Sequence, residues 1–82
     1  MTAVEVREEV LKAWNLAVKN DMQDPVIRLY ISGESDIDVW SEEGSFCFSK
    51  GSWRYDKLDE LLDDLCKEIG DNRINVTNVE IE

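Results

Sequence analysis

The strongest periodic signal in the sequence is an apolar stripe in the second half of the chain. Between residues 58 and 69, apolar side chains recur at intervals of three and four, which places them on one side of a helix: Leu58, Leu61, Leu62, Leu65, Cys66 and Ile69. A one-sided helix is stable when its stripe packs against another layer of structure. We therefore predict a helix here, with Asp56 as its N-terminal cap and Gly70 as its C-terminal stop.

Another helix is predicted over residues 3–21. Thr2 and Glu5 have the spacing of a capping box, in which each side chain accepts a hydrogen bond from the amide of the other residue. Apolar residues then recur at helical spacing as far as Val18. Pro25 disfavours helix in the residue before it, so the helix should end ahead of this proline.

The segment between the two helices has the alternation of strands. Three runs rich in β-branched and aromatic residues predict strands over residues 26–31, 36–40 and 45–49. Turns containing Gly33 and Gly44 join them, the second as a type I turn closed by a left-handed glycine, which favours an antiparallel meander. Residues 50–52 should end the sheet, with Trp53 beginning the run into the second helix.

A last strand is predicted over residues 73–82, with a bulge or an end to pairing near Asn78, because Val76 and Val79 break the two-residue period. The element order is then α-β-β-β-α-β. We expect one acidic α+β domain over residues 1–82, with both helices on one face of a small, mainly antiparallel sheet. The predicted sheet core is Ile27, Leu29, Ile31, Ile37, Val39, Phe46, Phe48, Ile74 and Val76.

The net charge of −10 is concentrated in two stretches of the chain. Residues 34–43 hold five acids and no base, and residues 55–70 hold six acids against two lysines. So much negative charge disfavours direct binding to nucleic acid and to anionic membrane surfaces. The simpler interpretation is that these acids form a solvated face that keeps the protein in solution. However, like charges four residues apart destabilise a helix slightly, which favours a binding role for the acids of the second helix.

The sequence lacks the residues and motifs that commonly carry catalysis. There is no His, the serines lack a Gly-x-Ser-x-Gly context, and Cys47 has no base near it in sequence. No metal site and no cofactor are predicted, because no ligand cluster or glycine-rich phosphate loop is present. We expect a protein that is not an enzyme.

Targeting signals, membrane-spanning stretches and the state of the cysteines bear on the compartment of the protein. No secretory signal, transit peptide or membrane-spanning stretch is evident, so a cytoplasmic protein is expected. Cys47 and Cys66 should be free thiols, with a disulfide between them as the alternative.

The predicted binding site is a patch of carboxylates beside outward aromatic side chains. Its contact residues are Tyr30, Glu34, Asp36, Asp38, Trp40, Glu42 and Glu43. Acids of the second helix should steer the encounter with a partner: Asp56, Asp59, Glu60, Asp63 and Asp64. Trp40 could instead pack on Tyr30, or lie under Trp53 or the last strand, and the same face could be buried in a homodimer.

These features together predict a small acidic protein-binding module, an inhibitor that docks on a basic surface of a nuclease or other nucleic-acid-binding protein. Its carboxylates would stand in for phosphates, as in phage-type anti-defence proteins or immunity proteins against nuclease toxins. The alternatives are a homodimeric structural or accessory protein that uses the aromatic sheet face, and a small acidic chaperone.

Overall fold

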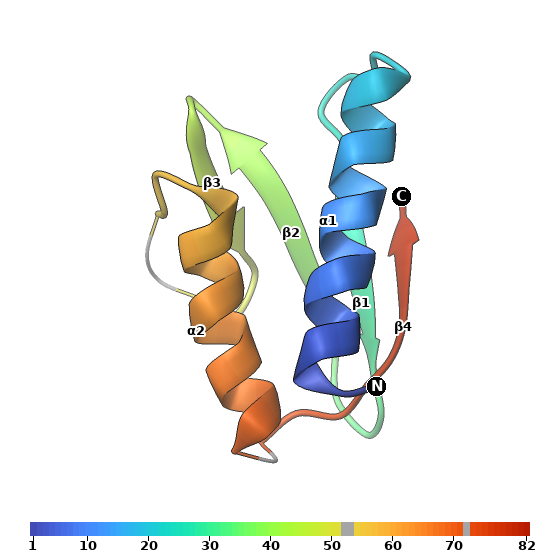
Figure 1. Ribbon diagram of the computed structural model, residues 1–82, viewed down its shortest axis with the longest axis vertical. Helices are drawn as coiled ribbons and strands as arrows, with labels where there is room; N and C mark the ends of the chain where they lie inside the picture. Colours follow the sequence, from blue (N-terminus) through green and yellow to red (C-terminus); the bar gives the residue numbers. More distant parts are fainter. Residues whose placement is uncertain (52–53, 72) are drawn as a thin grey trace.

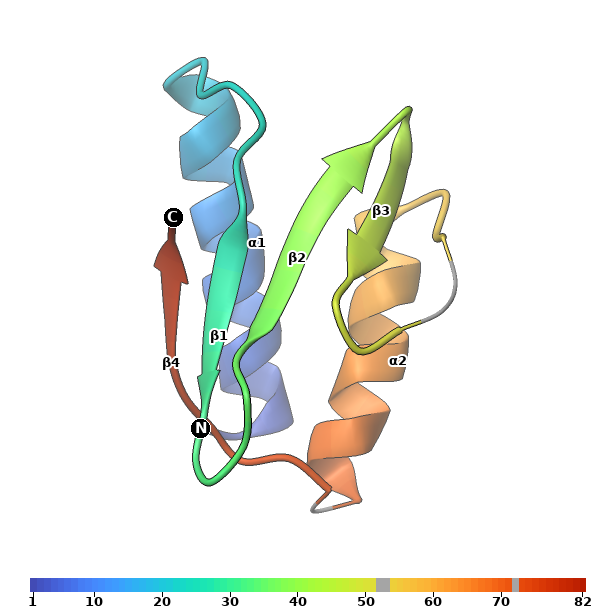
Figure 2. The ribbon, with the colours of Figure 1, turned by 180° about the vertical axis from the view of Figure 1, so that it is seen from behind.

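A four-stranded antiparallel sheet carries both helices on one of its faces (Figures 1 and 2). The structure, a computed structural model, describes residues 1–51, 54–71 and 73–82. The elements follow in the predicted order: α1 (Ala3–Lys19), β1 (Ile27–Ile31), β2 (Ile37–Glu42), β3 (Ser45–Phe48), α2 (Leu58–Gly70) and β4 (Val76–Ile81). The predicted α+β fold class is confirmed.

The strands lie in the order β3-β2-β1-β4, so the last strand returns to pair with the first. Ile27 is opposite Val39 on β2 and Ile81 on β4. The predicted bulge is present: Tyr30 pairs with Asn78 while Ile31 pairs with Val76, which leaves Thr77 as the extra residue. Pairing does not end there, since it continues to Ile81.

The core lies between the sheet and the two helices. Most predicted sheet residues are buried there, with Ile27, Leu29 and Val39 fully inaccessible. Phe46 and Ile74 differ from the prediction, because each is only half-buried at the margin of the core. The ring of Phe46 meets Trp14 of α1 edge-on at 5.3 Å between centroids, so the first helix covers it only in part.

The two helices begin differently. The capping box of α1 is confirmed, with the Glu5 amide donating to Thr2 Oγ1 and the Thr2 amide donating to Glu5 Oε1. The prediction of Asp56 as the cap of α2 is wrong: Lys57 occupies that position and its side chain makes no capping hydrogen bond. Gly70 is the last residue of α2 rather than a stop beyond it.

The β2–β3 turn also differs from its predicted type. Glu42 pairs with Ser45, and both intervening residues have left-handed backbones, with φ of 50° at Glu43 and 82° at Gly44. Two positive φ values define a type I′ turn, whose twist matches that of the flanking strands better than the expected type I. The predicted sheet break at residues 50–52 and the Trp53 prediction fall partly or wholly outside the described residues.

Candidate functional site: the helix-free face of the sheet

One face of the sheet carries no helix in the described part of the chain, as Figure 2 shows from behind. Strand alternation and the registers place nine side chains on this side, which we call the open face: Arg28, Tyr30, Asp38, Trp40, Glu42, Ser45, Cys47, Asn78 and Glu80. Four of the predicted contact residues, Tyr30, Asp38, Trp40 and Glu42, lie on it. The open face is therefore the part of the predicted site that the fold brings together.

Arg28 lies at the centre of the open face and is paired on both sides. Its Nε donates to Asp38 Oδ1 at 2.8 Å, and its Nη1 lies 3.5 Å from Glu82 Oε1. The hydrogen bonds to Asp38 raise the pKa of Arg28 further above its usual value. The charge of Asp38 is therefore already matched within the protein.

Tyr30 is tied to the acidic end of the chain. Its hydroxyl donates to Glu82 Oε1 at 2.9 Å and lies 3.3 Å from Glu80 Oε2. The hydrogen bond to Glu82, aided by desolvation, raises the pKa of Tyr30 to about 12. Tyr30 thus stays a neutral hydrogen-bond donor with its ring half-exposed.

Trp40 is the other half-exposed aromatic residue of the open face. Its indole Nε1 donates to Glu42 Oε2 at 3.4 Å, and it lies directly opposite Cys47, which is buried. The alternatives in which Trp40 packs on Tyr30 or under the last strand are not seen: the aromatic pairs among the described residues do not include Trp40, and β4 pairs in the sheet beside β1. The alternative involving Trp53 lies outside the described residues.

The remaining predicted contact residues surround the sheet rather than lie on the open face. Glu43 lies at the tip of the β2–β3 hairpin, next to Glu42 at the end of β2, and each of these two carboxylates is 3.7 Å from a nitrogen of Arg54. Glu34 pairs with Lys50 at 3.2 Å. Asp36 accepts a hydrogen bond from the Ile31 amide at 3.3 Å, so it closes the turn between β1 and β2.

Four of the five predicted steering acids belong to α2, on the opposite side of the sheet from the open face, whereas Asp56 precedes the N-cap of this helix (Figures 1 and 2). Arg7 of α1 pairs with Asp63 and lies 3.8 Å from Asp59. Asp56 and Glu60 are exposed and have no ion-pair partner among the residues that the structure describes. The two predicted acidic groups therefore do not form one surface.

Sequence reasoning missed the bases that neutralise the acidic patch. Arg28, Lys50 and Arg54 all lie outside the base-free window of residues 34–43, yet each pairs with an acid inside it. Strand alternation could have found Arg28, since it shares a face with Asp38. The other two pairs depend on how loops fold back and carry no local signal.

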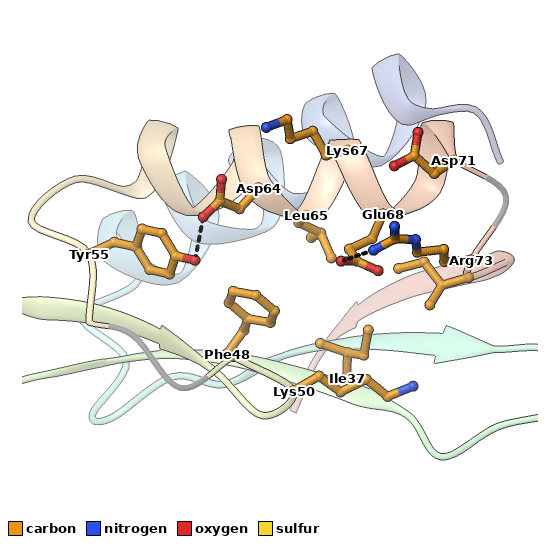
Figure 3. A pocket seen from close by; sticks show the side chains of 12 residues that line it. Ile37, Phe48, Lys50, Tyr55, Asp64, Leu65, Lys67, Glu68, Asp71 and Arg73 are labelled. Carbon is orange, nitrogen blue, oxygen red and sulfur yellow. Dashed lines mark hydrogen bonds and ion pairs between the residues drawn. The ribbon is translucent and has the colours of Figure 1, made fainter.

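A second concave site lies between α2 and the ends of β2 and β3, with a volume of about 620 Å³ (Figure 3). Tyr55 and Asp64 lie at one end and the Glu68–Arg73 ion pair at the other, with Phe48 and Leu65 between them. The cations and carboxylates that line this pocket are equal in number: Lys50, Lys67 and Arg73 with Asp64, Glu68 and Asp71. Its rim is therefore electrically balanced in a protein that is otherwise strongly negative.

Tyr55 supports this pocket from within. Its ring stacks on Phe48 at 5.9 Å between centroids, and its hydroxyl donates to Asp64 Oδ2 at 2.7 Å. Burial and this hydrogen bond raise the pKa of Tyr55 to about 12. Tyr55 therefore stays protonated and donates to Asp64. Asp64 is thus engaged by a hydrogen bond within the protein, unlike the other exposed acids of α2 such as Glu60.

Both cysteines of the chain are free thiols, as expected. Cys47 lies on the open face, whereas Cys66 Sγ lies on the helix side, 3.5 Å from the carbonyl of Ala3. Within the described ranges, no group of three or more His, Cys, Asp or Glu side chains is placed to hold a metal ion. The described helices include none long and apolar enough to cross a membrane.

Comparisons of the chain with protein-family models, with curated proteins and with solved structures find no match, so the open face and its surroundings are the basis for inferring function.

Proposed function

We propose that this protein is a non-catalytic binding module that docks its open face on a basic surface of another protein. The observation that carries the proposal is the pair of half-exposed aromatic side chains, Tyr30 and Trp40, on a sheet face without helices. Aromatic anchors within a charged rim are typical of protein interfaces. Carboxylates of Glu42, Glu80 and Glu82 supply that rim.

The arrangement of charges favours a basic partner over a neutral one. Arg28 is committed to Asp38 and Glu82, and Arg54 lies near two acids at the hairpin tip, so each base is outnumbered. A partner that brings lysines or arginines would find carboxylates with unfilled acceptor sites on both flanks of the aromatic residues. Long-range attraction would speed the encounter and weaken with salt.

The exposed acids of α2 fit the role of steering rather than contact. α2 lies on the far side of the sheet from the open face, so its exposed Glu60 adds to the field of the whole protein without touching a partner seated on the open face. In its sharpest form, the proposal is that the partner normally binds nucleic acid, and that these carboxylates take the place of phosphates and inhibit that binding.

The experiment is quantitative capture of partners from the native host by the immobilised protein, at low and at physiological salt. The test variant is Glu42→Lys with Glu43→Lys, and the matched control is Glu8→Lys with Asp71→Lys. All four are exposed, and both double variants change the net charge equally. The proposal requires a captured protein that is lost with the test variant, retained with the control and more weakly held as salt rises.

The Trp40→Ala variant tests how much the aromatic side chain contributes to binding, because it leaves the charge of the protein unchanged. Loss of a buried aromatic anchor typically costs about 2 kcal/mol or more in binding, roughly thirtyfold in affinity, at any salt concentration. If both double variants lost the captured protein equally, binding would depend on the net charge alone and not on Glu42 and Glu43, which would overturn the proposal. A tight homodimer that occludes Trp40, measured by concentration-dependent mass, would favour the alternative of self-association through the open face.

A further inference from the structure

The free edge of β4 borders the open face at Glu80, but it presents backbone groups of the strand rather than aromatic side chains. β4 is the last strand of the sheet, and its hydrogen bonds to β1 use alternate residues. The Glu82 amide donates to the Val26 carbonyl at 2.8 Å, whereas the Val79 amide donates instead to the side chain of Asn78 at 2.9 Å. The backbone groups of Val79 and Ile81 therefore point away from β1, toward the free edge, where the Asn78 side chain occupies the Val79 amide and an added strand would have to displace it.

A shallow apolar groove runs beside this edge on the helix side of the sheet. Its volume is about 180 Å³, and it lies between α1 and β4 with these lining residues: Glu9, Lys12, Ala13, Leu16, Val79, Glu80 and Ile81. Leu16 is 47% exposed and lines this groove together with the half-buried Val79 and Ile81. An apolar side chain placed against Leu16 and Ile81 would therefore lose water contact.

The other side of the same edge is acidic. Glu80 faces the helix-free side, where its register partner is Arg28, and Glu82 follows at the end of the strand. Both glutamates are exposed. A strand laid along β4 would thus meet apolar side chains on one side and carboxylates on the other.

We propose that the β4 edge binds an extended segment of the partner as a fifth strand, and that basic and apolar residues alternate along this segment. Successive side chains of a strand point to opposite faces, so one set would reach Glu80 and Glu82 while the other filled the groove at Leu16. This inference rests on the proposed function, because it takes the partner to be basic. It adds that the recognised segment is extended and that its basic and apolar residues alternate.

A second copy of the chain is the less suitable occupant. Antiparallel pairing of β4 with its own counterpart would gather Glu80 and Glu82 of both copies on one face of the joined sheet. Like charges on neighbouring strands destabilise their pairing, and each copy carries a net charge of −10. The basic segment avoids that repulsion and gains attraction in its place.

The test uses the full chain and a short, end-capped peptide in which Lys and Val alternate. The comparison peptide has the same composition, with its lysines and valines in separate blocks. We expect the alternating peptide to bind roughly tenfold more tightly by calorimetry, because only alternation matches both sides of the edge. N-methylation of every second residue, which removes the amides facing β4, should abolish that advantage.

Leu16→Gln and Val18→Gln form a matched pair of variants, since both side chains are exposed on α1 and only Leu16 lines the groove. Leu16→Gln should weaken binding of the alternating peptide severalfold, and Val18→Gln should leave it unchanged. Equal binding of the two peptides, or equal effects of the two variants, would overturn the inference.

Failure of this inference is distinguishable from failure of the proposed function. If the peptide shows no preference while partner capture still depends on Glu42 and Glu43, only strand addition at β4 is wrong. If the alternating peptide binds as expected while partner capture ignores those glutamates, docking on the open face is wrong and the β4 edge stands.

Discussion

The guanidinium of Arg28 makes two hydrogen bonds to the carboxylate of Asp38 across the β1–β2 pair, 2.8 Å from Nε to Oδ1 and 3.3 Å from Nη2 to Oδ2. This bidentate pair sits between the two aromatic residues of the open face and neutralises the acid nearest to its centre. The carboxylates left for a basic partner therefore lie at the margin, at Glu42 beside Arg54 and at Glu80 beside the Tyr30 hydroxyl. The open face is an aromatic surface with an acidic edge rather than a uniformly acidic one.

Tyr30 should ionise far above its ordinary range, because ionisation would break its hydrogen bond to Glu82 and place a second negative charge beside that carboxylate. Its pKa is raised to about 12 from 10.0. In the Tyr55→Phe variant, which leaves Tyr30 as the single tyrosine, phenolate absorbance should rise with a midpoint near 12 in the folded state and near 10 in urea. A folded-state midpoint near 10 would contradict the hydrogen bond, and Glu82→Gln should move the midpoint downward.

The same pKa shift makes stability fall in alkali. A tyrosine whose folded-state pKa is above its unfolded value stabilises the fold fully below pH 10.0, and loses that contribution as pH rises through about 12. Urea unfolding at about pH 9 and about pH 11 should show a lower midpoint at the higher pH. The fall should be smaller in Tyr30→Phe, and an unchanged fall would assign it to other groups.

Lys57→Ser should stabilise the protein. Lys57 has the extended backbone of an N-cap, with φ of −132° and ψ of 144°, but a lysine side chain cannot accept from the free amides of the first turn and is unfavourable at the positive end of a helix. Serine would supply an acceptor, which is worth about 1 kcal/mol. Chemical unfolding measures the gain.

Asp56→Ala is the control for the position of the cap. Since Asp56 lies before the N-cap, its loss should change the free energy of unfolding by less than about 0.5 kcal/mol. A loss of about 1 kcal/mol or more would restore Asp56 as the cap.

The sequence was a good guide to α2 itself and a poor guide to its first residue. The stripe from Leu58 to Ile69 predicts the helix because burial of five of its side chains determines which side faces inward. The cap differs because aspartate caps a helix only when it is the residue immediately before the first helical one, and here the helix begins at the buried Leu58, one residue later than Asp56 would need. Local preference yielded to tertiary packing.

Leu65→Ala should strongly destabilise the fold. Leu65 is fully buried on the inner side of α2, so its truncation leaves a cavity and should cost about 2–5 kcal/mol, a large part of the stability of a small domain. Leu16→Ala is the control, because an exposed leucine of the other helix should cost less than about 1 kcal/mol. Similar losses for both variants would contradict the packing of α2 on the sheet.

The candidate site was less predictable than the core for a physical reason. Apolar periodicity predicted the inward residues of β1 and β2, whereas the predicted core residues Phe46 and Ile74 are only half-buried. The same alternation placed Tyr30, Asp38 and Trp40 outward. Ion pairs follow no such period: the contact of Lys50 with Glu34 depends on where two loops meet. The local count of charge in the 34–43 stretch was correct, but its electrostatic effect depends on bases from elsewhere in the chain.

Glu43 occupies a backbone conformation that suits other residues better. With φ of 50° at Glu43 and 82° at Gly44, the type I′ turn favours asparagine followed by glycine. A left-handed conformation costs most L-residues about 1–2 kcal/mol, and asparagine less. Glu43→Asn should therefore stabilise the protein by about 0.5–1 kcal/mol, measured by thermal or urea unfolding.

The loss of the Glu43 carboxylate should not offset this gain. Its distance of 3.7 Å from Arg54 and its 84% exposed side chain describe a surface ion pair, which contributes little to stability. Glu42→Gln is the control: Glu42 belongs to β2, where no left-handed strain is relieved, so no comparable stabilisation is expected. If Glu43→Asn is more stable and also captures less partner than the parent, the strained glutamate is kept for binding, whereas unchanged capture would leave its carboxylate outside the interface.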